Sequence, residues 1–247
     1  MSVTDPHLSI VLPAYREKEN LAILIPQIED GFRDTVHEII VVDDGSKDGT
    51  RELMESFNTT YGNIVLIERA GLMGIGSALR DGYNKARGTY IISSDADCAF
   101  SVADMRALFA KIHTGDDLVL GYKLPGGVHD EATHGGWSVQ GWLENHVTSP
   151  LSNRIIGLIT GMGYKNYNTN FRAIRTSLWK RLKPVEDRQF FLFEVLLGAK
   201  RANAKIAEVP VNFSSRQAGE SKISFFKQAP SYLYKLIRIT YLNRGPN

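Results

Sequence analysis

The sequence predicts an α/β domain with a mostly parallel central sheet flanked by helices. Between residues 8 and 123, short apolar segments alternate with longer segments of helical spacing, as in repeated strand–helix units. The segment EIIVVDD (38–44) is an apolar run without alternation, which is typical of a parallel strand covered on both faces. In sheets of this kind, ligands bind beyond the carboxyl ends of the strands.

The elements of this first part can be assigned in chain order. Strands are predicted for LSIVLPA (8–14), EIIVVDD (38–44), NIVLIER (63–69), TYIISSD (89–95) and DLVLGYK (117–123). Helices are predicted between them for residues 16–32, for a segment ending near 58, for residues 74–88 and for residues 101–113. The first helix carries apolar residues at helical spacing, and the last begins with Ser101 and Asp104, which resemble a capping box.

The pattern changes after residue 123. Residues 123–136, KLPGGVHDEATHGG, are Gly-rich and polar without periodicity, and a loop of this length is usually functional or disordered. Residues 137–161 have helix-like spacing, QFFLFEVLLGAKRAN (189–203) predicts a strong helix, and KIAEVPVNF (205–213) predicts a strand. Pro210 lies inside that strand and indicates an edge position, because proline cannot donate a hydrogen bond to a neighbouring strand.

Composition limits the functional classes. The chain has 247 residues, 43% of them hydrophobic, and a formal net charge of +2, which argues against a nucleic-acid-binding domain. The single cysteine, Cys98, excludes an intramolecular disulfide framework and fits a reducing compartment. We find neither a secretory signal nor an apolar segment of membrane-spanning length. We therefore expect a cytoplasmic protein, with peripheral contact to the cytoplasmic membrane face left open.

Polar side chains follow four of the predicted strands. The strand ends read PAYRE (13–17), DDGS (43–46), DAD (95–97) and GYK (121–123). Parallel strands bring these ends to one rim, where the acids would repel each other unless a cation or hydrogen-bond donors compensate. An Asp-x-Asp pair can hold Mg²⁺ or Mn²⁺, which in turn binds phosphate oxygens. The alternatives are structural: Asp95 and Asp97 could cap the following helix, and Asp43 and Asp44 could serve a turn.

Several segments resemble glycosyltransferase family 2, and within it the dolichyl-phosphate or polyprenyl-phosphate mannose and glucose synthases. These segments are SIVLPAYREKENL (9–21), EIIVVDDGSKDGT (38–50), GIGSALRDGYNKARGTYIISSDAD (74–97), NFRAIR (170–175) and AEVPVNFSSRQAGESK (207–222). The combination of VVDDGSKDGT with a downstream DAD is a strong signal for the family, and GESK is more specific to the branch. The resemblance implies a single domain with the Rossmann-like GT-A fold.

The resemblance also assigns the nucleotide pocket. It implies that Pro13, Tyr15 and Glu17 line this pocket together with Asp43 or Asp44. The base would stack near the first of these loops. The nucleotide-sugar half of the domain would then extend over residues 8–123, the acceptor half over 124–222, and an amphipathic C-terminal helix over 223–247.

The same resemblance assigns the metal and the charged residues around the reaction centre. Asp95 and Asp97 correspond to the family's DxD motif, and are expected to bind Mg²⁺ or Mn²⁺ and the nucleotide-sugar diphosphate. Lys123 stands where the family usually has an arginine. Arg216 and Lys222 match the basic residues around GESK, and would reach the diphosphate or the acceptor phosphate.

The sequence departs from the family pattern near these residues. Related synthases often read DADLQH or DADLSH, whereas this chain continues with Cys98, Ala99 and Phe100. The polar side chain that can complete the metal shell is absent, so water or Ser101 would substitute. The usual TSGFR is NTNFR (168–172). The acceptor region, residues 137–163, lacks the usual arginine-rich pattern.

The chemistry of the reaction depends on the acceptor. The family inverts the anomeric centre by a single displacement, and cations would stabilise the departing diphosphate. A phosphate monoester is already nucleophilic, whereas a hydroxyl acceptor needs a carboxylate to take its proton. Glu194 interrupts an apolar helix face and is the predicted base, and Asp187 is the second candidate. The structural alternative is that Glu194 is a core acid paired with a nearby arginine. The predicted catalytic residues are Asp97, Glu194, Arg216 and Lys222.

Three functional hypotheses follow. The first is transfer of a hexose from a nucleotide-sugar, GDP-mannose before UDP-glucose, to a polyprenyl phosphate. The second is transfer to a glycan or small-molecule hydroxyl, and the third is a non-catalytic nucleotide-sugar-binding protein. The amphipathic tail SFFKQAPSYLYKLIRITYLNR (224–244) either lies on anionic lipid or packs on the domain or in a homodimer interface.

Overall fold

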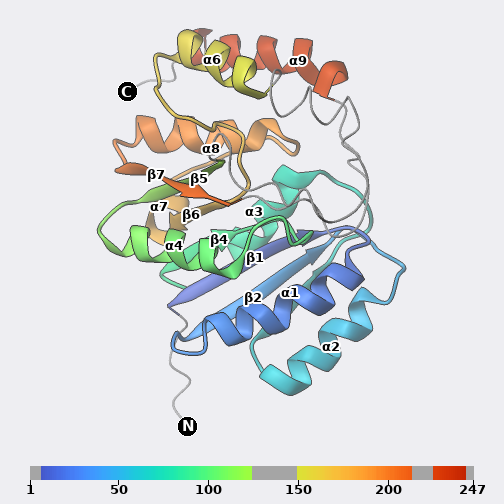
Figure 1. The fold of residues 1–247 in the computed structure, drawn as a ribbon. Coiled ribbons are helices and arrows are strands. Elements are labelled where there is room, and N and C mark those ends of the chain that lie inside the picture. The colour runs from blue at the N-terminus through green and yellow to red at the C-terminus, as the bar shows by residue number, and fades with distance from the viewer. Residues whose placement is uncertain (1–6, 124–148, 213–224, 243–247) are drawn as a thin grey trace, which may run out of the picture. The chain divides into compact units, whose positions relative to one another are not determined.

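The computed structural model describes residues 7–123, 149–212 and 225–242 (Figure 1). The chain divides into two compact units. The first comprises Met1–His129 and Asn168–Gly219, and the second comprises Asp130–Tyr167 and Glu220–Asn247. The first unit holds the sheet and the helices that cover it.

One sheet organises the first unit. Its strands are β1 (Leu8–Ala14), β2 (His37–Asp43), β3 (Ile64–Glu68), β4 (Tyr90–Ser93), β5 (Leu118–Lys123), β6 (Arg172–Arg175) and β7 (Ile206–Val211). They lie in the order β3-β2-β1-β4-β6-β5-β7. β6 runs antiparallel to its neighbours β4 and β5, and the other pairs are parallel. The predicted mostly parallel sheet is therefore confirmed.

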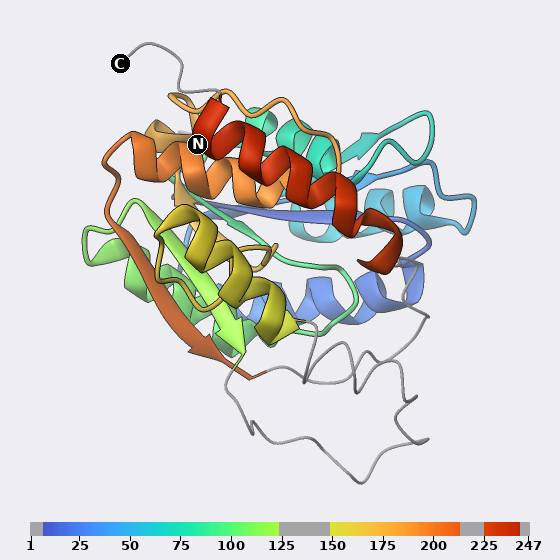
Figure 2. The same cartoon turned by 90° about the horizontal axis from the view of Figure 1, so that it is seen from above.

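Strand β7 lies at the edge of the sheet beside β5 (Figure 2). This confirms the edge position that Pro210 indicated. The antiparallel strand β6 was not predicted. It has only four residues, which is too short to carry a recognisable period.

Helices cover both faces of the sheet in the first unit (Figure 1). They are α1 (Lys18–Gly31), α2 (Thr50–Tyr61), α3 (Ile75–Lys85), α4 (Val102–His113), the single turn α7 (Thr176–Trp179) and α8 (Phe190–Arg201). The predicted capping box of α4 is confirmed, because the Ser101 side chain accepts from the Asp104 backbone N–H and Asp104 accepts from the backbone N–H of Ser101. The helix therefore begins where the sequence indicated.

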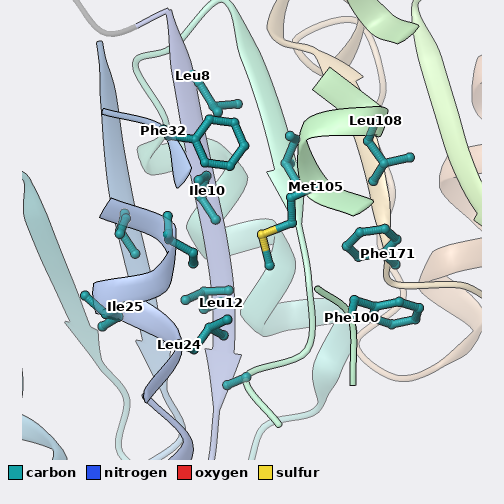
Figure 3. Packing of buried hydrophobic residues seen from close by; sticks show 14 of the residues in the cluster. Leu8, Ile10, Leu12, Leu24, Ile25, Phe32, Phe100, Met105, Leu108 and Phe171 are labelled. Atoms are coloured by element: carbon teal, nitrogen blue, oxygen red, sulfur yellow. The ribbon is translucent and has the colours of Figure 1, made fainter. Parts of the chain in front are cut away.

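Alternation along β1 sends its side chains to two different layers. Figure 3 shows Leu8, Ile10 and Leu12 facing the apolar side chains of α1 and α4, including Leu24 and Met105. All five side chains are at most 1% exposed. This buried cluster fixes the position of α1 relative to β1, and so positions the loop that joins them.

Val11 points to the other face, where α3 packs closely on the sheet. A Cβ atom added at Gly82 of α3 would lie 2.4 Å from Val11 Cγ1 and 3.2 Å from Val42 Cγ2. A β-branched side chain in a buried strand has little freedom to move away. Glycine is therefore needed at this crossing for the helix to approach the strands.

The second unit contains α6 (Ser149–Thr160), α9 (Phe225–Ile237) and a short π-helical segment, η2 (Arg238–Leu242). The hydroxyl of Tyr241 donates a hydrogen bond to the carbonyl of Ile159, which ties the end of η2 to α6. None of the helices in the described ranges is long and apolar enough to span a bilayer.

Replacing Gly82 with alanine is expected to destabilise the protein. Forcing a methyl group against Val11 should cost about 1–3 kcal/mol, partly offset by the gain of about 1 kcal/mol in helix propensity. Urea unfolding followed by circular dichroism measures the difference. Gly71→Ala is the control, because nothing lies within 4 Å of its added Cβ, and its free energy of unfolding should stay within about 0.5 kcal/mol. Equal unfolding midpoints for the two variants would contradict the close approach of α3.

Candidate functional site at the carboxyl ends of the strands

The parallel register brings the predicted site segments to one rim. Ala14 at the end of β1 pairs with Asp43 at the end of β2, and Val11 pairs with Ser93 of β4. Pairing continues past the strands, because Asp44 N donates to Ala14 O at 2.9 Å and Ser94 N donates to Val11 O at 3.2 Å. The loops after β1, β2 and β4 therefore begin side by side.

The loops after β1 and β2 are joined to each other. Arg16 N donates to Ser46 Oγ at 2.7 Å, and Lys18 N donates to Asp48 Oδ2 at 3.3 Å. These bonds connect the segment that carries Pro13, Tyr15 and Glu17 to the DDGSKDG turn. The two loops thus form one continuous wall of the rim.

Asp43 organises its own turn. Its Oδ2 accepts from Ser46 N at 2.9 Å and its Oδ1 accepts from Ser46 Oγ at 2.5 Å. Gly45 has a φ of 79°, a conformation that favours glycine. The turn reading of Asp43 is therefore confirmed, and its contact with a nucleotide stays a prediction.

Asp44 is buried beside Arg69, the residue that follows β3. Asp44 Oδ1 and Arg69 Nη1 are 2.7 Å apart, although the two atoms are not aligned as a hydrogen bond. Arg69 also donates to Ser77 Oγ of α3. Burial raises the pKa of the Asp44 carboxyl, while the Arg69 charge and the backbone amides of Met73 and Gly74 act in the opposite direction. Asp44 thus holds the segment between β3 and α3.

Asp95 and Asp97 follow β4 without capping a helix. The N-cap of α4 is Ser101, so the helix-cap alternative for these two acids is wrong. Asp97 is 6% exposed and its Oδ1 accepts from Ala99 N at 3.1 Å. Asp95 Oδ1 accepts from Asn170 Nδ2 at 3.0 Å. Both carboxylates are thereby fixed at the carboxyl end of β4.

Cys98 connects the DAD turn to the first loop. It has a φ of 59°, and its Sγ lies 3.6 Å from the carbonyl oxygen of Asn20, whose side chain donates to Glu17 Oε2 at 2.7 Å. Burial raises the pKa of the Cys98 thiol, and so do the negative charges of Asp97 and Glu17. Both acids therefore lie close enough to this thiol to oppose its ionisation.

Ser101 is engaged in the helix cap. Its hydroxyl donates to Asp104 Oδ2 at 2.7 Å and accepts from Asp104 N at 3.1 Å. The expectation that Ser101 completes the metal shell is therefore not supported by its contacts. Across the described ranges, no group of three or more His, Cys, Asp or Glu side chains could hold a metal ion.

Glu194 lies on α8 and bonds to the backbone. Its Oε2 accepts from Val185 N at 3.0 Å and from Glu186 N at 2.9 Å. Asp187, in the same loop, pairs with Arg80 at 3.0 Å. The structure thus gives both carboxylates a role in holding the loop before α8, and a role as catalytic base stays a prediction for each.

The predicted cations lie in different parts of the chain. Lys123 is exposed at the end of β5, whose carboxyl end faces the same way as that of β4, because both run antiparallel to β6. Arg216 and Lys222 lie outside the described residues. Their predicted contacts with phosphate stay predictions.

Asn170 is the site residue that motif reading did not assign. It lies in the turn before β6, is 7% exposed, and reaches Asp95 across 75 positions of sequence. The only hint in the sequence was the departure NTNFR at residues 168–172. Its partner could not be inferred without the pairing of β4 with β6.

Comparison with known proteins identifies similar chains. Residues 9–181 match the family described as Glycosyl transferase family 2. The chain is 26% identical to the low-salt glycan biosynthesis hexosyltransferase Agl6 of Haloferax volcanii, over 93% of this chain and 55% of that protein. It is 27% identical to the polyprenol monophosphomannose synthase of Mycolicibacterium smegmatis, over 87% of this chain and 80% of that protein. It is 28% identical to the dolichol-phosphate mannosyltransferase of Pyrococcus furiosus, over 87% of this chain and 59% of that protein. The chain thus spans little more than half the length of two of these relatives.

Solved structures share the fold. Glucosyl-3-phosphoglycerate synthase from Mycobacterium tuberculosis, crystallised with Mn²⁺, uridine diphosphate and phosphoglyceric acid, superposes with a TM-score of 0.66. The match covers 94% of this chain and 78% of that one, at 19% identity. The structure of the same enzyme with Mg²⁺ and uridine diphosphate superposes with a TM-score of 0.65, at 18% identity. These similarities confirm the predicted GT-A fold.

Removing the Arg69 side chain is expected to destabilise the site. Arg69→Met leaves the Asp44 carboxylate buried opposite no cation, which should cost about 3 kcal/mol in free energy of unfolding. Adding Asp44→Asn should recover part of that loss, because the two residues are coupled. Arg51→Met is the control, since its pairs with Glu55 and Glu68 are exposed and should contribute less than about 1 kcal/mol. Strictly additive losses in the double variant would argue against the Asp44–Arg69 pair.

Proposed function

We propose that this chain, which belongs to glycosyl transferase family 2, transfers a hexose from a nucleotide-sugar to a polyprenyl phosphate with inversion at the anomeric centre. The hexosyltransferase activity, the donor, the metal, the acceptor and the stereochemistry are all part of the proposal. The observation that carries it is the pair Asp95 and Asp97, fixed at the end of β4 next to the loop that holds Glu17.

The donor proposed first is GDP-mannose, and the second is UDP-glucose. Two of the three relatives described above are named polyprenol monophosphomannose synthase and dolichol-phosphate mannosyltransferase. These names support mannose as the transferred sugar. Pro13, Tyr15, Glu17 and Asp43 would line the pocket for the nucleotide. The bonds that join their loops to one another support a preformed wall.

The residues at the rim fit a divalent ion. Asp97 is almost fully buried and Asp95 is oriented by a hydrogen-bond donor, so two hard oxygen ligands are held ready for Mg²⁺ or Mn²⁺. When bound there, the ion would neutralise charge that develops on the departing diphosphate. Lys123, Arg216 and Lys222 would supply further positive charge for the same purpose.

The contacts of Glu194 favour a phosphate acceptor. A phosphate monoester is ionised at neutral pH and needs no general base, whereas a hydroxyl acceptor does. The Glu194 carboxylate already accepts two backbone hydrogen bonds, and Asp187 pairs with Arg80. Because both carboxylates already have partners, the contacts of Glu194 and Asp187 favour a phosphate acceptor, which does not have to lose a proton.

The second unit supports contact with a lipid surface. Helix α6 exposes Leu151, Ile155 and Leu158, which lie on one face at helical spacing, and Leu158 is 80% exposed. The α9–η2 segment exposes four more large apolar residues: Leu233, Tyr234, Ile237 and Tyr241. Arg154 and Arg238 are also exposed in this unit. Exposed apolar faces with neighbouring arginines are typical of helices that lie on anionic membranes.

The proposed reaction can be tested with a panel of donors and acceptors. With Mn²⁺ or Mg²⁺, GDP-mannose and a short-chain polyprenyl phosphate, we expect lipid-dependent release of GDP and mannosyl lipid of inverted configuration. Asp97→Asn should lower the rate about a hundredfold or more, because the metal contributes several kcal/mol of charge stabilisation.

The control for that assay is Asp34→Asn, which removes a carboxylate from an exposed pair with Arg106 and should leave the rate unchanged. Release of nucleotide only with a sugar acceptor would point to a hydroxyl acceptor instead. Nucleotide-sugar binding without turnover, unchanged in Asp97→Asn, would refute both the catalytic and the metal assignment.

Membrane contact can be tested by co-sedimentation with vesicles. The protein should pellet with phosphatidylglycerol vesicles and less with phosphatidylcholine vesicles, because the arginines favour anionic lipid. The double variant Leu151→Glu, Leu158→Glu should lose binding. Val185→Glu is the control, since Val185 is also an exposed apolar residue but lies in the first unit. Equal pelleting of all three proteins, or none, would rule out the α6 face as the contact.

A further inference from the structure

The side chain of Asn170 is held against the DAD turn from the other half of the sequence. Its Nδ2 donates to Asp95 Oδ1 at 3.0 Å, and the residue is 7% exposed. A carboxylate only accepts hydrogen bonds, so the N–H end of the carboxamide must face Asp95. The orientation of the amide is therefore fixed by chemistry, and its oxygen faces another direction.

The turn that carries Asn170 is rigid. Ser93 Oγ of β4 donates to the Asn170 carbonyl at 2.6 Å. Phe171 N donates to Thr169 Oγ1 at 3.0 Å, and the buried guanidinium of Arg172 donates through Nε to Thr169 O at 2.8 Å and through Nη1 to Leu192 O at 3.0 Å. These bonds fix the backbone on both sides of Asn170, so its side chain has little freedom to leave Asp95.

The carboxamide oxygen of Asn170 has no hydrogen-bond partner among the described residues. Asn170 Oδ1 is buried from solvent and accepts no hydrogen bond within the described part of the chain. Leaving a buried acceptor without a hydrogen bond is unfavourable, because the atom has lost its contact with water and gained nothing in return. A position that keeps such an atom beside an aspartate pair is suited to a ligand that supplies positive charge.

We propose that Asn170 is a third protein ligand of the divalent ion, with its Nδ2 orienting Asp95 and its Oδ1 binding the metal. This inference rests on the proposed function and names a residue for the same site. Asparagine carbonyl oxygens are ordinary ligands of hard cations. The described residues offer no third acid or histidine here, and Ser101 is engaged in its helix cap.

A neutral ligand has a physical advantage at this rim. Asp95 and Asp97 already lie in the turn after β4, and Asp43 lies at the end of β2, on the other side of β1. A third carboxylate next to Asp95 would add repulsion whenever the metal is absent. An amide adds an oxygen without a charge, and its N–H donates a hydrogen bond to Asp95.

Asn63 provides a matched control elsewhere in the same unit. Its Nδ2 donates to Glu29 Oε1 at 3.0 Å, and its Oδ1 is likewise buried without a hydrogen-bond partner among the described residues. It lies just before β3, at the opposite end of the strands, in contact with His37. An alanine at position 63 therefore removes the same amide–carboxylate contact without touching the rim.

The test measures metal binding directly. Mn²⁺ affinity is determined by electron paramagnetic resonance of the free ion, with and without GDP, for the full chain and its variants. Asn170→Ala should weaken Mn²⁺ binding about tenfold or more, the usual effect of losing a residue that binds or orients a metal ligand. Asn63→Ala should bind Mn²⁺ as the unmodified chain does, although both variants lose stability.

Asn170→Asp separates ligation from orientation. It keeps an oxygen and loses the N–H that holds Asp95, so a ligand role predicts that Mn²⁺ affinity is retained or increased. Equal loss in Asn170→Ala and Asn170→Asp would overturn the ligand role and leave only orientation. If Asn170→Ala does not fold, Asn170→Gly replaces it, since glycine occupies this position in the TSGFR pattern and needs no side-chain space.

The failures of the two proposals are distinguishable. Unchanged Mn²⁺ affinity in Asn170→Ala, with binding lost in Asp97→Asn, would overturn the role of Asn170 and leave the metal site intact. No Mn²⁺ binding by the unmodified chain, with or without GDP, would overturn both. Hexose transfer that persists without any divalent ion would overturn the metal while leaving the transferase activity.

Discussion

The parallel pairing of β1 with both of its neighbours is the constraint on which the site depends. It sets Ala14 level with Asp43 and Val11 level with Ser93. The loops that follow these strands therefore start at one edge, although they come from distant parts of the sequence. A slip of one residue in either pairing would turn every side chain of the shifted strand to the opposite face, so burial on both faces of β1 also fixes the position of the acids.

The acids brought together at this rim are each compensated in a different way. Asp44 faces Arg69, Asp43 accepts from its own turn, and Asp95 accepts from Asn170. These contacts offset part of the repulsion between the carboxylates, because each one places a hydrogen-bond donor or an opposite charge beside an acid. Burial is the main cause of the raised pKa of the Cys98 thiol, and the charges of Asp97 and Glu17 act in the same direction.

Much of the fold could be predicted from sequence because its signals are local. Apolar runs marked the parallel strands, and Ser101 with Asp104 marked the start of α4. The rim could be predicted as well, since strand ends in a parallel sheet must converge. What could not be predicted depends on contacts over long sequence separations. The Asn170–Asp95 bond requires the pairing of β4 with β6, and the amides that Glu194 holds are identified only by the path of the loop before α8.

The contacts of the acids also bear on what the reaction asks of the protein. If the acceptor were a hydroxyl, a carboxylate at the acceptor side would have to remain available to take its proton. Glu194 instead holds two amides, and Asp187 holds Arg80. A phosphate acceptor changes the requirement, because two anions must then approach each other and their repulsion has to be offset by cations. In the function we propose, a metal ion held by Asp95 and Asp97 after β4 would supply positive charge for this purpose, together with Lys123 at the end of β5 of the same sheet.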